Sequence, residues 1–163
     1  MVLTELPFGL PGRVFRSPMP FGWDNDTGET FRQYQHANVS TVVVLVGEEE
    51  CRIEAGRDLR AFYIAEGLQV IDLPIPDWGV PEFAEANRAV DRTLKLARSG
   101  QNIAIHCHAG IGRTGLFSAC LARRVLGLSG EEAIAWVRRV VPRAIETEEQ
   151  IQFVKAFETS MQE

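Results

Sequence analysis

One segment, residues 106–115, combines a possible nucleophile with groups that bind phosphate. It reads His-Cys-His-Ala-Gly-Ile-Gly-Arg-Thr-Gly, with Cys107 near its start and Arg113 six positions later. Glycines allow such a segment to curve tightly, so that its backbone N–H groups can converge on an anion. The planar guanidinium of an arginine binds two phosphate oxygens at once. The segment therefore predicts a phosphate-binding loop whose binding residues are His108, Ala109, Gly110, Ile111, Gly112 and Arg113.

Cys107 lies where a cysteine can react as a thiolate. It directly follows the apolar run 102–106 and comes shortly before a largely apolar segment, 116–126, that has the composition of a helix. A helix N-terminus and a nearby arginine both favour the thiolate over the thiol. A thiolate can attack phosphorus without a separate base and form a phosphocysteine. The hydroxyl of Thr114 could donate a hydrogen bond to the sulfur and help it leave.

A proton donor is needed as well, because the leaving alkoxide or phenolate must be protonated. Asp77 is the candidate general acid, since it lies in a proline-rich loop, 74–81, that follows a short strand-like run. Asp72 is the rival, although it falls at the end of that run. The alternative role for Asp77 is that of an ordinary solvated aspartate in a turn. Trp78 is expected to pack the loop rather than to touch substrate.

The order of residues in segment 106–115 resembles the signature of the protein tyrosine phosphatase superfamily, which is His-Cys, five residues, Arg, then Ser or Thr. Residues 76–81, Pro-Asp-Trp-Gly-Val-Pro, are similar to the acid loop of its tyrosine-specific branch. The small size and the Ile-Pro-Asp order are most like the small atypical dual-specificity phosphatases. The chain has no equivalent of the Lys-Asn-Arg-Tyr segment of the large tyrosine-specific enzymes. The resemblance covers roughly residues 40–158.

This resemblance implies a cysteine-dependent phosphatase that hydrolyses phosphotyrosine, with phosphoserine and phosphothreonine as further candidates. Cys107 would be the nucleophile, Arg113 the phosphate ligand, and Asp77 the acid that later deprotonates the hydrolytic water. Neither a metal nor a cofactor is expected. Phosphoinositide and RNA 5′-phosphate substrates stay open, although the loop lacks the lysines typical of the phosphoinositide branch.

The resemblance also implies supporting roles for residues around the loop. His106 is similar to a histidine that supports the loop from behind, and it is not expected to shuttle protons. His108 either rims the pocket or points to solvent. Gln150 matches a glutamine that orients the hydrolytic water, but its place in the helix-capping sequence Thr-Glu-Glu-Gln is sufficient to explain it. Glu146 stands where the tyrosine-specific enzymes have their first glutamine, and Arg143 is expected to be a surface arginine.

Two other functional classes compete with this interpretation. Residues 110–115 satisfy the G-x-G-x-x-G pattern of dinucleotide-binding oxidoreductases. That fold requires a second parallel strand after the helix, and no β-branched run follows Leu126 before the next helix. A phosphopeptide-binding module without turnover would keep the loop but typically loses its Cys or Arg, and both are present here.

The composition fits one soluble domain in the cytoplasm. The chain has 163 residues, of which 45% are hydrophobic, and a net charge of −5. This acidic balance argues against nucleic acid as a partner. No signal peptide is recognised, and no apolar run approaches the ~20 residues that span a bilayer. Three cysteines without metal-like spacing favour reduced thiols. The expected partner is a phosphoprotein or phosphopeptide rather than a membrane, and the expected state is a monomer.

Strand-like and helix-like segments alternate along the chain. This pattern predicts a single α/β domain over residues 1–163, with a central, mostly parallel sheet flanked by helices and a helical C-terminal part. Residues 1–28 are expected to be irregular apart from a short strand at 14–16. The other predicted strands are 41–46, 69–72 and 102–106. The predicted helices are 29–37, 58–66, 82–99, 116–126, 129–140 and a last one from 147 to near Met161.

Overall fold

A five-stranded sheet forms the middle of the molecule in the computed structural model, which describes residues 2–22 and 26–158. The strand order is β1-β2-β5-β3-β4, and all neighbours are parallel except β1 and β2. The strands are β1 (Thr4–Leu6), β2 (Val14–Ser17), β3 (Val39–Val44), β4 (Gln69–Asp72) and β5 (Asn102–His106). The predicted α/β class with a mostly parallel sheet is confirmed.

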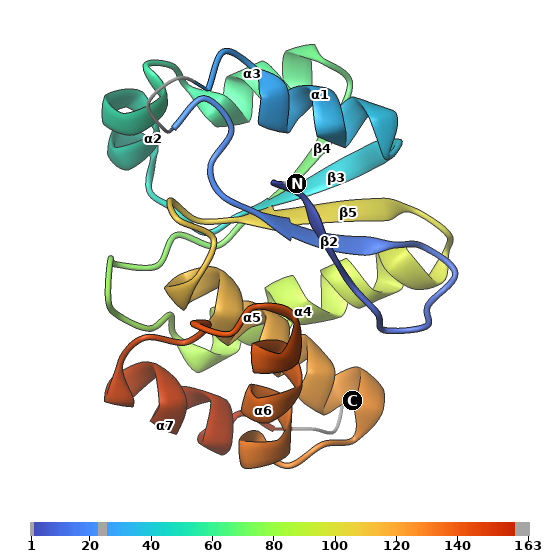
Figure 1. The fold of residues 1–163 in the computed structure, drawn as a ribbon, viewed down its shortest axis with the longest axis vertical. Coiled ribbons are helices and arrows are strands. Elements are labelled where there is room, and N and C mark those ends of the chain that lie inside the picture. Colours follow the sequence, from blue (N-terminus) through green and yellow to red (C-terminus); the bar gives the residue numbers. More distant parts are fainter. Residues whose placement is uncertain (1, 23–25, 159–163) are drawn as a thin grey trace.

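Helices cover both faces of this sheet (Figure 1). Helices α1, α2 and α3 lie on one face, and helices α4 to α7 lie on the other, where the C-terminal part of the chain forms a helical layer. The helices are α1 (Glu29–His36), α2 (Glu48–Ala55), α3 (Leu59–Ala65), α4 (Phe83–Arg98), α5 (Gly112–Leu126), α6 (Gly130–Val140) and α7 (Glu148–Ala156). Within the described residues, none of them is long and apolar enough to cross a membrane.

Strand β5 occupies the centre of the sheet and leads into the loop predicted to bind phosphate. It lies between β2 and β3, and its residues 103–105 are completely buried because helices cover both faces. The pairing sets Ser17 of β2 and Val44 of β3 level with His106. The carboxyl ends of three parallel strands thus meet at one edge, which is where open α/β sheets bind ligands.

Helix boundaries follow local capping chemistry. Helices α6 and α7 begin after Ser129 and Thr147, whose side chains accept the backbone N–H of Glu132 and Gln150, so both predicted capping boxes are confirmed. Helix α5 begins at Gly112, four residues before the start of the apolar segment, because its first turn belongs to the phosphate-binding loop. Helix α7 ends at Ala156, and the predicted end near Met161 lies outside the described residues.

Two elements depart from the sequence-based expectation. The expectation of an irregular segment 1–28 is wrong at β1, a three-residue edge strand that pairs antiparallel with β2 and is too short to show a period in sequence. Helix α2 was not predicted either, because only Cys51 and Ala55 of its eight residues are buried and its sequence has no apolar period. Its acidic first turn suits the positive end of a helix dipole.

Candidate active site

A cavity of about 110 Å³ opens at the carboxyl edge of the sheet. It brings together three stretches of chain, and the residues lining it are Asp77, Trp78, Cys107, His108, Ala109, Gly112, Arg113, Glu146 and Gln150. The candidate nucleophile, phosphate ligand and acid therefore share one cavity. A larger cavity of about 590 Å³ lies between α1 and the β1–β2 pair, but its lining contains no cysteine.

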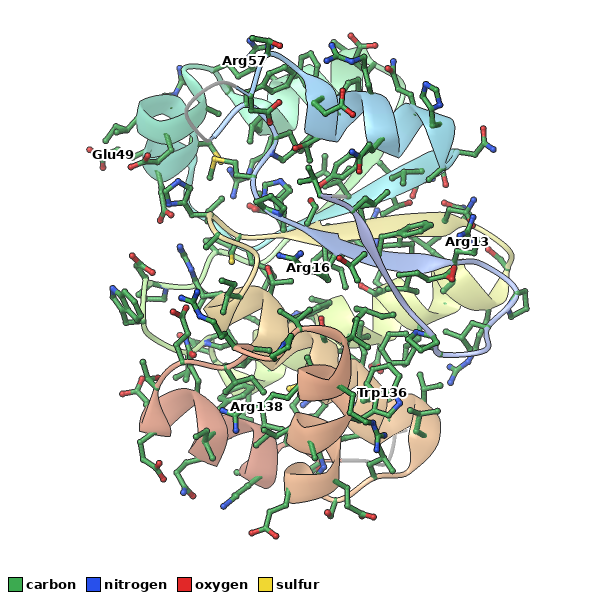
Figure 2. All side chains as sticks on the ribbon, in the orientation of Figure 1. Arg13, Arg16, Glu49, Arg57, Trp136 and Arg138 are labelled. Carbon is green, nitrogen blue, oxygen red and sulfur yellow. The ribbon has the colours of Figure 1, made fainter. Side chains whose placement is uncertain are left out.

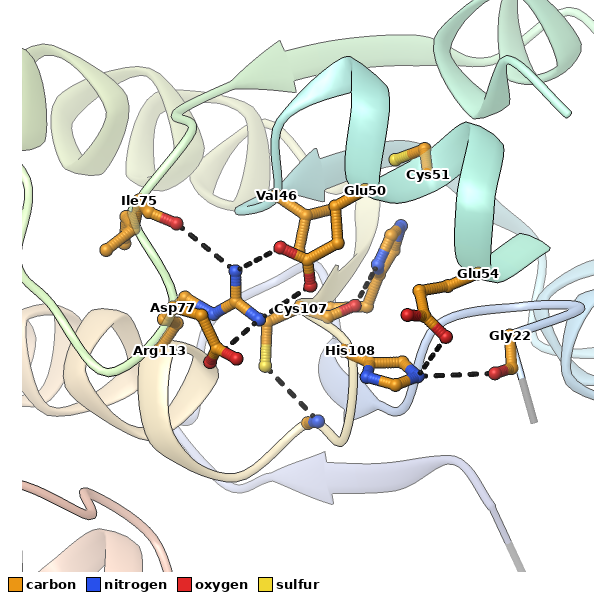
Figure 3. A network of polar contacts seen from close by, with 12 residues as sticks. Gly22, Val46, Glu50, Cys51, Glu54, Ile75, Asp77, Cys107, His108 and Arg113 are labelled. Atoms are coloured by element: carbon orange, nitrogen blue, oxygen red, sulfur yellow. Dashed lines mark hydrogen bonds and ion pairs between the residues drawn. The ribbon is translucent and has the colours of Figure 1, made fainter. Parts of the chain in front are cut away.

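Cys107 lies at the base of the loop with only 2% of its surface exposed. The backbone N–H of Gly110 donates a hydrogen bond to its Sγ atom over 3.2 Å (Figure 3). Gly110 has a φ of 77°, in the left-handed region that glycine adopts without strain, and a Cβ there would overlap the Arg16 guanidinium and the Ser17 carbonyl. The curvature that turns this amide toward the sulfur therefore depends on glycine.

Arg113 is held by a carboxylate from another helix. Its Nη1 and Nη2 atoms donate to the two carboxylate oxygens of Glu50 over 3.0 and 2.8 Å, and Nη1 also donates to the carbonyl of Ile75 over 3.2 Å (Figure 3). Burial alone would lower the pKa of Arg113, but the bonds to Glu50 and the charge of Cys107 raise it above its ordinary value. The same bonds hold the pKa of Glu50 below its ordinary value. The guanidinium is therefore charged and fixed in direction.

Asp77 lies across the cavity from the loop and is far more exposed. Its Oδ1 atom is 3.3 Å from Nη2 of Arg113, and 61% of its side chain is exposed. The acid loop is held to the start of α7, because Gln150 Nε2 donates to the Gly79 carbonyl over 3.2 Å. The rival Asp72 does not line the cavity and instead pairs with Arg60.

Trp78 differs from the sequence-based expectation. It is 59% exposed and lines the cavity, so the expectation that it packs the loop is wrong. Its φ of 66° is uncommon for a bulky residue. The hydroxyl of Thr147 donates to its carbonyl over 3.2 Å and helps to hold this conformation. The aromatic ring therefore forms part of the rim of the cavity.

His106 contacts the loop from inside the core. It is completely buried, and burial lowers its pKa to about 4, so the ring is neutral near pH 7. Its Nδ1 atom lies 2.9 Å from the Cys107 carbonyl, which can only accept, so this nitrogen carries the proton. Its Nε2 atom, 2.8 Å from the hydroxyl of Tyr63, is then the acceptor. Both ring nitrogens are occupied and neither faces the cavity.

The remaining loop residues divide between the cavity and its surroundings. His108 lines the cavity, yet its Nε2 atom lies 3.3 Å from the Gly22 carbonyl and 3.5 Å from a carboxylate oxygen of Glu54. Of the other predicted phosphate-binding residues, Gly110 and Ile111 do not line the cavity. The hydroxyl of Thr114 is buried and has no hydrogen-bond partner among the described residues, so the expected bond to the sulfur is not formed here.

Glu146, in the segment before α7, and Gln150, in the first turn of α7, both line the cavity. The Gln150 side-chain oxygen accepts from the backbone N–H of Glu146 over 2.9 Å and of Thr147 over 3.3 Å, so it is engaged in capping. The Glu146 carboxylate lies so close to Gly112 that a Cβ at that glycine would overlap it. Arg143 is exposed and does not line the cavity.

Sequence reasoning missed three residues that build this site, namely Arg16, Glu50 and Tyr63. They lie on β2, α2 and α3, far from the loop in sequence. One signal was available for Glu50, because three consecutive glutamates, 48–50, follow a buried strand at the edge where the loop was expected. For Arg16 and Tyr63 the sequence contains no comparable signal.

Comparisons with known proteins agree with this geometry. The sequence model of a family described as "Polymorphic toxin system, DSP-PTPase phosphatase" matches residues 19–125. The dual specificity protein phosphatase CDC14C of Symphalangus syndactylus is 29% identical over 151 residues, which cover 90% of this chain and 28% of that protein. Protein tyrosine phosphatase domain-containing protein 1 of Danio rerio is 32% identical over 95 residues, which cover 58% of this chain and 13% of that protein. The chain thus spans a minor part of these relatives.

Solved structures show the same fold. The active form of Tk-PTP superimposes with a TM-score of 0.76 at 30% identity, covering 93% of this chain and 94% of that one. Kinase associated phosphatase, with its catalytic-site cysteine replaced by serine, superimposes with a TM-score of 0.84 at 20% identity. The superposition covers 93% of this chain and 90% of that chain. On the family match and these likenesses, the chain belongs to the DSP-PTPase family of the protein tyrosine phosphatase superfamily.

Proposed function

We propose that this protein is a cysteine-dependent phosphatase that hydrolyses phosphotyrosine in proteins through a phosphocysteine at Cys107. One observation carries the proposal, which is that Cys107, Arg113 and Asp77 line a single cavity at the carboxyl edge of the sheet. No other cavity described here combines a cysteine with an arginine and a carboxylate. The phosphatase names of the relatives support the same class of reaction.

Phosphate binding is the first requirement of this reaction. The phosphate dianion would enter the loop between the backbone amides and Arg113, whose fork Glu50 holds in direction. Arginine has five N–H donors, and Glu50 and Ile75 leave others free to bind phosphate oxygens. Donors fixed in advance cost no reorganisation when charge develops in the transition state. The loop therefore combines binding with transition-state stabilisation.

The chemistry would then proceed in two displacements. The Cys107 thiolate attacks phosphorus in line, the bond between phosphorus and the ester oxygen breaks, and the proton of Asp77 passes to that oxygen. Water next attacks the phosphocysteine, Asp77 takes a proton from this water, and the sulfur–phosphorus bond breaks. The products are the alcohol, inorganic phosphate and the regenerated thiolate. The exposure of Asp77 gives it access to both the leaving group and the water.

The rim of the cavity favours an aromatic substrate. Trp78 presents an exposed ring beside Asp77 and Cys107, where the phenyl ring of phosphotyrosine could stack. Phosphoserine and phosphothreonine are further candidates, because the curated relatives include dual specificity phosphatases. We also propose that residues 1–163 act as one cytoplasmic, monomeric domain. The three free, buried cysteines support the cytoplasmic location, because thiols stay reduced there.

A substrate panel tests the proposal. Phosphotyrosine peptides, phosphothreonine peptides, soluble phosphoinositides and RNA 5′-phosphates would be compared by phosphate release, with Cys107→Ser as the blank. We expect turnover of phosphotyrosine peptides that survives EDTA and is blocked by vanadate. Stoichiometric binding of phosphopeptides without phosphate release would instead show a binding module. Loss of turnover on chelation, restored by a divalent ion, would contradict the mechanism.

A further inference from the structure

Arg16 of β2 makes a set of contacts with the back of the phosphate-binding loop. Its Nε and Nη2 atoms donate to the Gly110 carbonyl over 3.1 and 2.7 Å, and Nη2 also donates to the Ala109 carbonyl over 3.3 Å. Figure 2 shows Arg16 near the middle of the molecule, whereas Arg13, directly before the start of β2, lies away from it. One guanidinium therefore binds two successive carbonyls of the loop.

The Ala109 carbonyl and the Gly110 N–H belong to the same peptide group. Arg16 donates to the oxygen of this group, while its N–H donates to the Cys107 sulfur over 3.2 Å. A cation at the oxygen end polarises a peptide and strengthens the hydrogen bond that its N–H makes. The three groups thus form a relay that runs from the guanidinium through one peptide to the sulfur.

Two ionisable side chains, Cys107 and Tyr34, interact with the charge of Arg16. Among the described residues no carboxylate forms an ion pair with its guanidinium, and the bonds that it makes go to carbonyls. Burial lowers the pKa of Arg16, and the negative charge of Cys107 opposes this effect. An arginine stays protonated near neutral pH even so. A partly buried cation without a carboxylate is costly unless an anion compensates it, and Cys107 is the first group whose negative charge would do so.

We propose that Arg16 is a positioning residue that stabilises the Cys107 thiolate from behind the loop, through the Ala109–Gly110 peptide. Gly110 makes this arrangement possible, because a side chain there would occupy the space of the guanidinium. The inference deepens the proposed function, since it rests on Cys107 being the nucleophile. It adds a second arginine, which does not line the cavity, to the groups that favour the reactive form of the sulfur.

The test measures the ionisation of Cys107 without requiring turnover. The rate of its carbamidomethylation by iodoacetamide would be followed against pH, and the modified cysteine would be identified by peptide mass. Arg16→Met keeps roughly the volume of the side chain but loses its charge and its hydrogen-bond donors. For this variant we expect the midpoint of the plot of alkylation rate against pH to move up by about one pH unit. A shift of this size is at the low end of what a nearby opposite charge produces. Below the midpoint, alkylation at fixed pH then slows about tenfold. For Arg16→Lys we expect a smaller movement.

Arg13→Met is the matched control, because Arg13 directly precedes the same strand, is exposed and pairs with Glu5 instead of the loop. Its alkylation profile should superimpose on that of the wild type. If Arg16→Met does not melt cooperatively, Arg16→Gln decides by the same criterion. A folded Arg16 variant without its charge whose profile matches the wild type would overturn the proposal, even if its melting temperature fell. A wild type that hydrolyses no phosphate monoester, yet whose Cys107 midpoint depends on Arg16, would refute the proposed function and leave this inference standing.

Discussion

The two walls of the cavity differ in how firmly the fold holds them. The wall formed by the phosphate-binding loop is buried, with Cys107 2% exposed and the loop bonded to Arg16. The opposite wall is the acid loop, whose Asp77 side chain is 61% exposed. A thiolate needs donors fixed around it in advance, whereas a proton donor must meet successive partners. The difference in burial therefore matches the difference between the two chemical tasks.

The acid wall is also attached to a different layer of the molecule. Its loop is bonded through Thr147 and Gln150 to the start of α7, on the helical C-terminal layer. The loop wall is supported by side chains from β2, α2 and α3, and it also accepts a backbone hydrogen bond, from the Ile145 N–H to the Ile111 carbonyl. A substitution on the buried wall should therefore slow the turnover of every substrate to a similar degree. A substitution on the exposed wall should slow the turnover of some substrates more than others.

Removing the nucleophile should have the largest effect. Cys107→Ser replaces the thiolate with a hydroxyl that is hardly ionised at neutral pH, so we expect kcat to fall by more than about 10³-fold on every substrate. Binding of a phosphate analogue should survive, because the amides and Arg113 remain. Cys51→Ser and Cys120→Ser are the controls and should stay active, as neither cysteine lines the cavity. Residual activity of a few per cent in Cys107→Ser would refute this role.

Removing the acid should have a large but uneven effect. Asp77→Asn cannot donate an acidic proton, and general acid–base catalysis contributes about 10²–10⁴-fold. We expect a loss of that size on phosphotyrosine and a smaller one on a nitrophenyl phosphate, whose leaving group needs less protonation. The rates would be measured on aryl phosphates of graded leaving-group acidity. Asp72→Asn is the control, and if Asp77→Asn keeps the wild-type dependence on the leaving group, the acid lies elsewhere.

The candidate phosphate-binding loop and the candidate acid could be proposed from sequence because each lies within a short contiguous segment. Chain geometry alone brings Cys107 to the start of a loop that ends in Arg113, once a buried strand precedes it. The supporting residues could not be found in this way. Glu50 lies on a helix without an apolar period, and the approach of Arg16 depends on the pairing of β2 with β5, which β-branched runs do not reveal. Trp78 was misjudged because exposure depends on neighbours distant in sequence.

Weakening the support of Arg113 should have a moderate effect. Glu50→Gln keeps the shape of the side chain but loses the charge that orients the guanidinium. We expect kcat/KM to fall about tenfold on all substrates alike, which corresponds to one charge-assisted hydrogen bond of about 1.5 kcal/mol. Glu49→Gln on the same helix is the matched control and should resemble the wild type (Figure 2). An effect that varied with the leaving group would place Glu50 with the acid instead of the loop.

His106 should affect stability more than catalysis. Its pKa is about 4 in the folded protein, below the ordinary 6.5, so the unfolded chain binds a proton first as the pH falls. The contribution of neutral His106 is thus complete above pH 6.5 and is lost as the pH falls toward about 4. From this group we expect the free energy of unfolding to drop by up to about 1.4 kcal/mol per pH unit.

Denaturant unfolding between pH 6.5 and pH 5 measures this slope, because few carboxylates titrate there. His106→Asn should flatten it. The exposed His36 provides the control, and His36→Asn should leave the slope unchanged. If the free energy of unfolding depends on pH equally in the wild type and in His106→Asn, burial does not lower the pKa of His106.

Trapping the phosphoenzyme tests the central claim most directly. Asp77→Asn protein would be mixed with an aryl phosphate that has a good leaving group, quenched in acid and digested, since this variant also slows the second displacement. We predict that the peptide containing Cys107 gains the mass of one phosphoryl group, while the peptides containing Cys51 and Cys120 do not. Release of the aryl alcohol with the phosphoryl group on another side chain, or with no phosphorylated peptide at any quench time, would contradict the account.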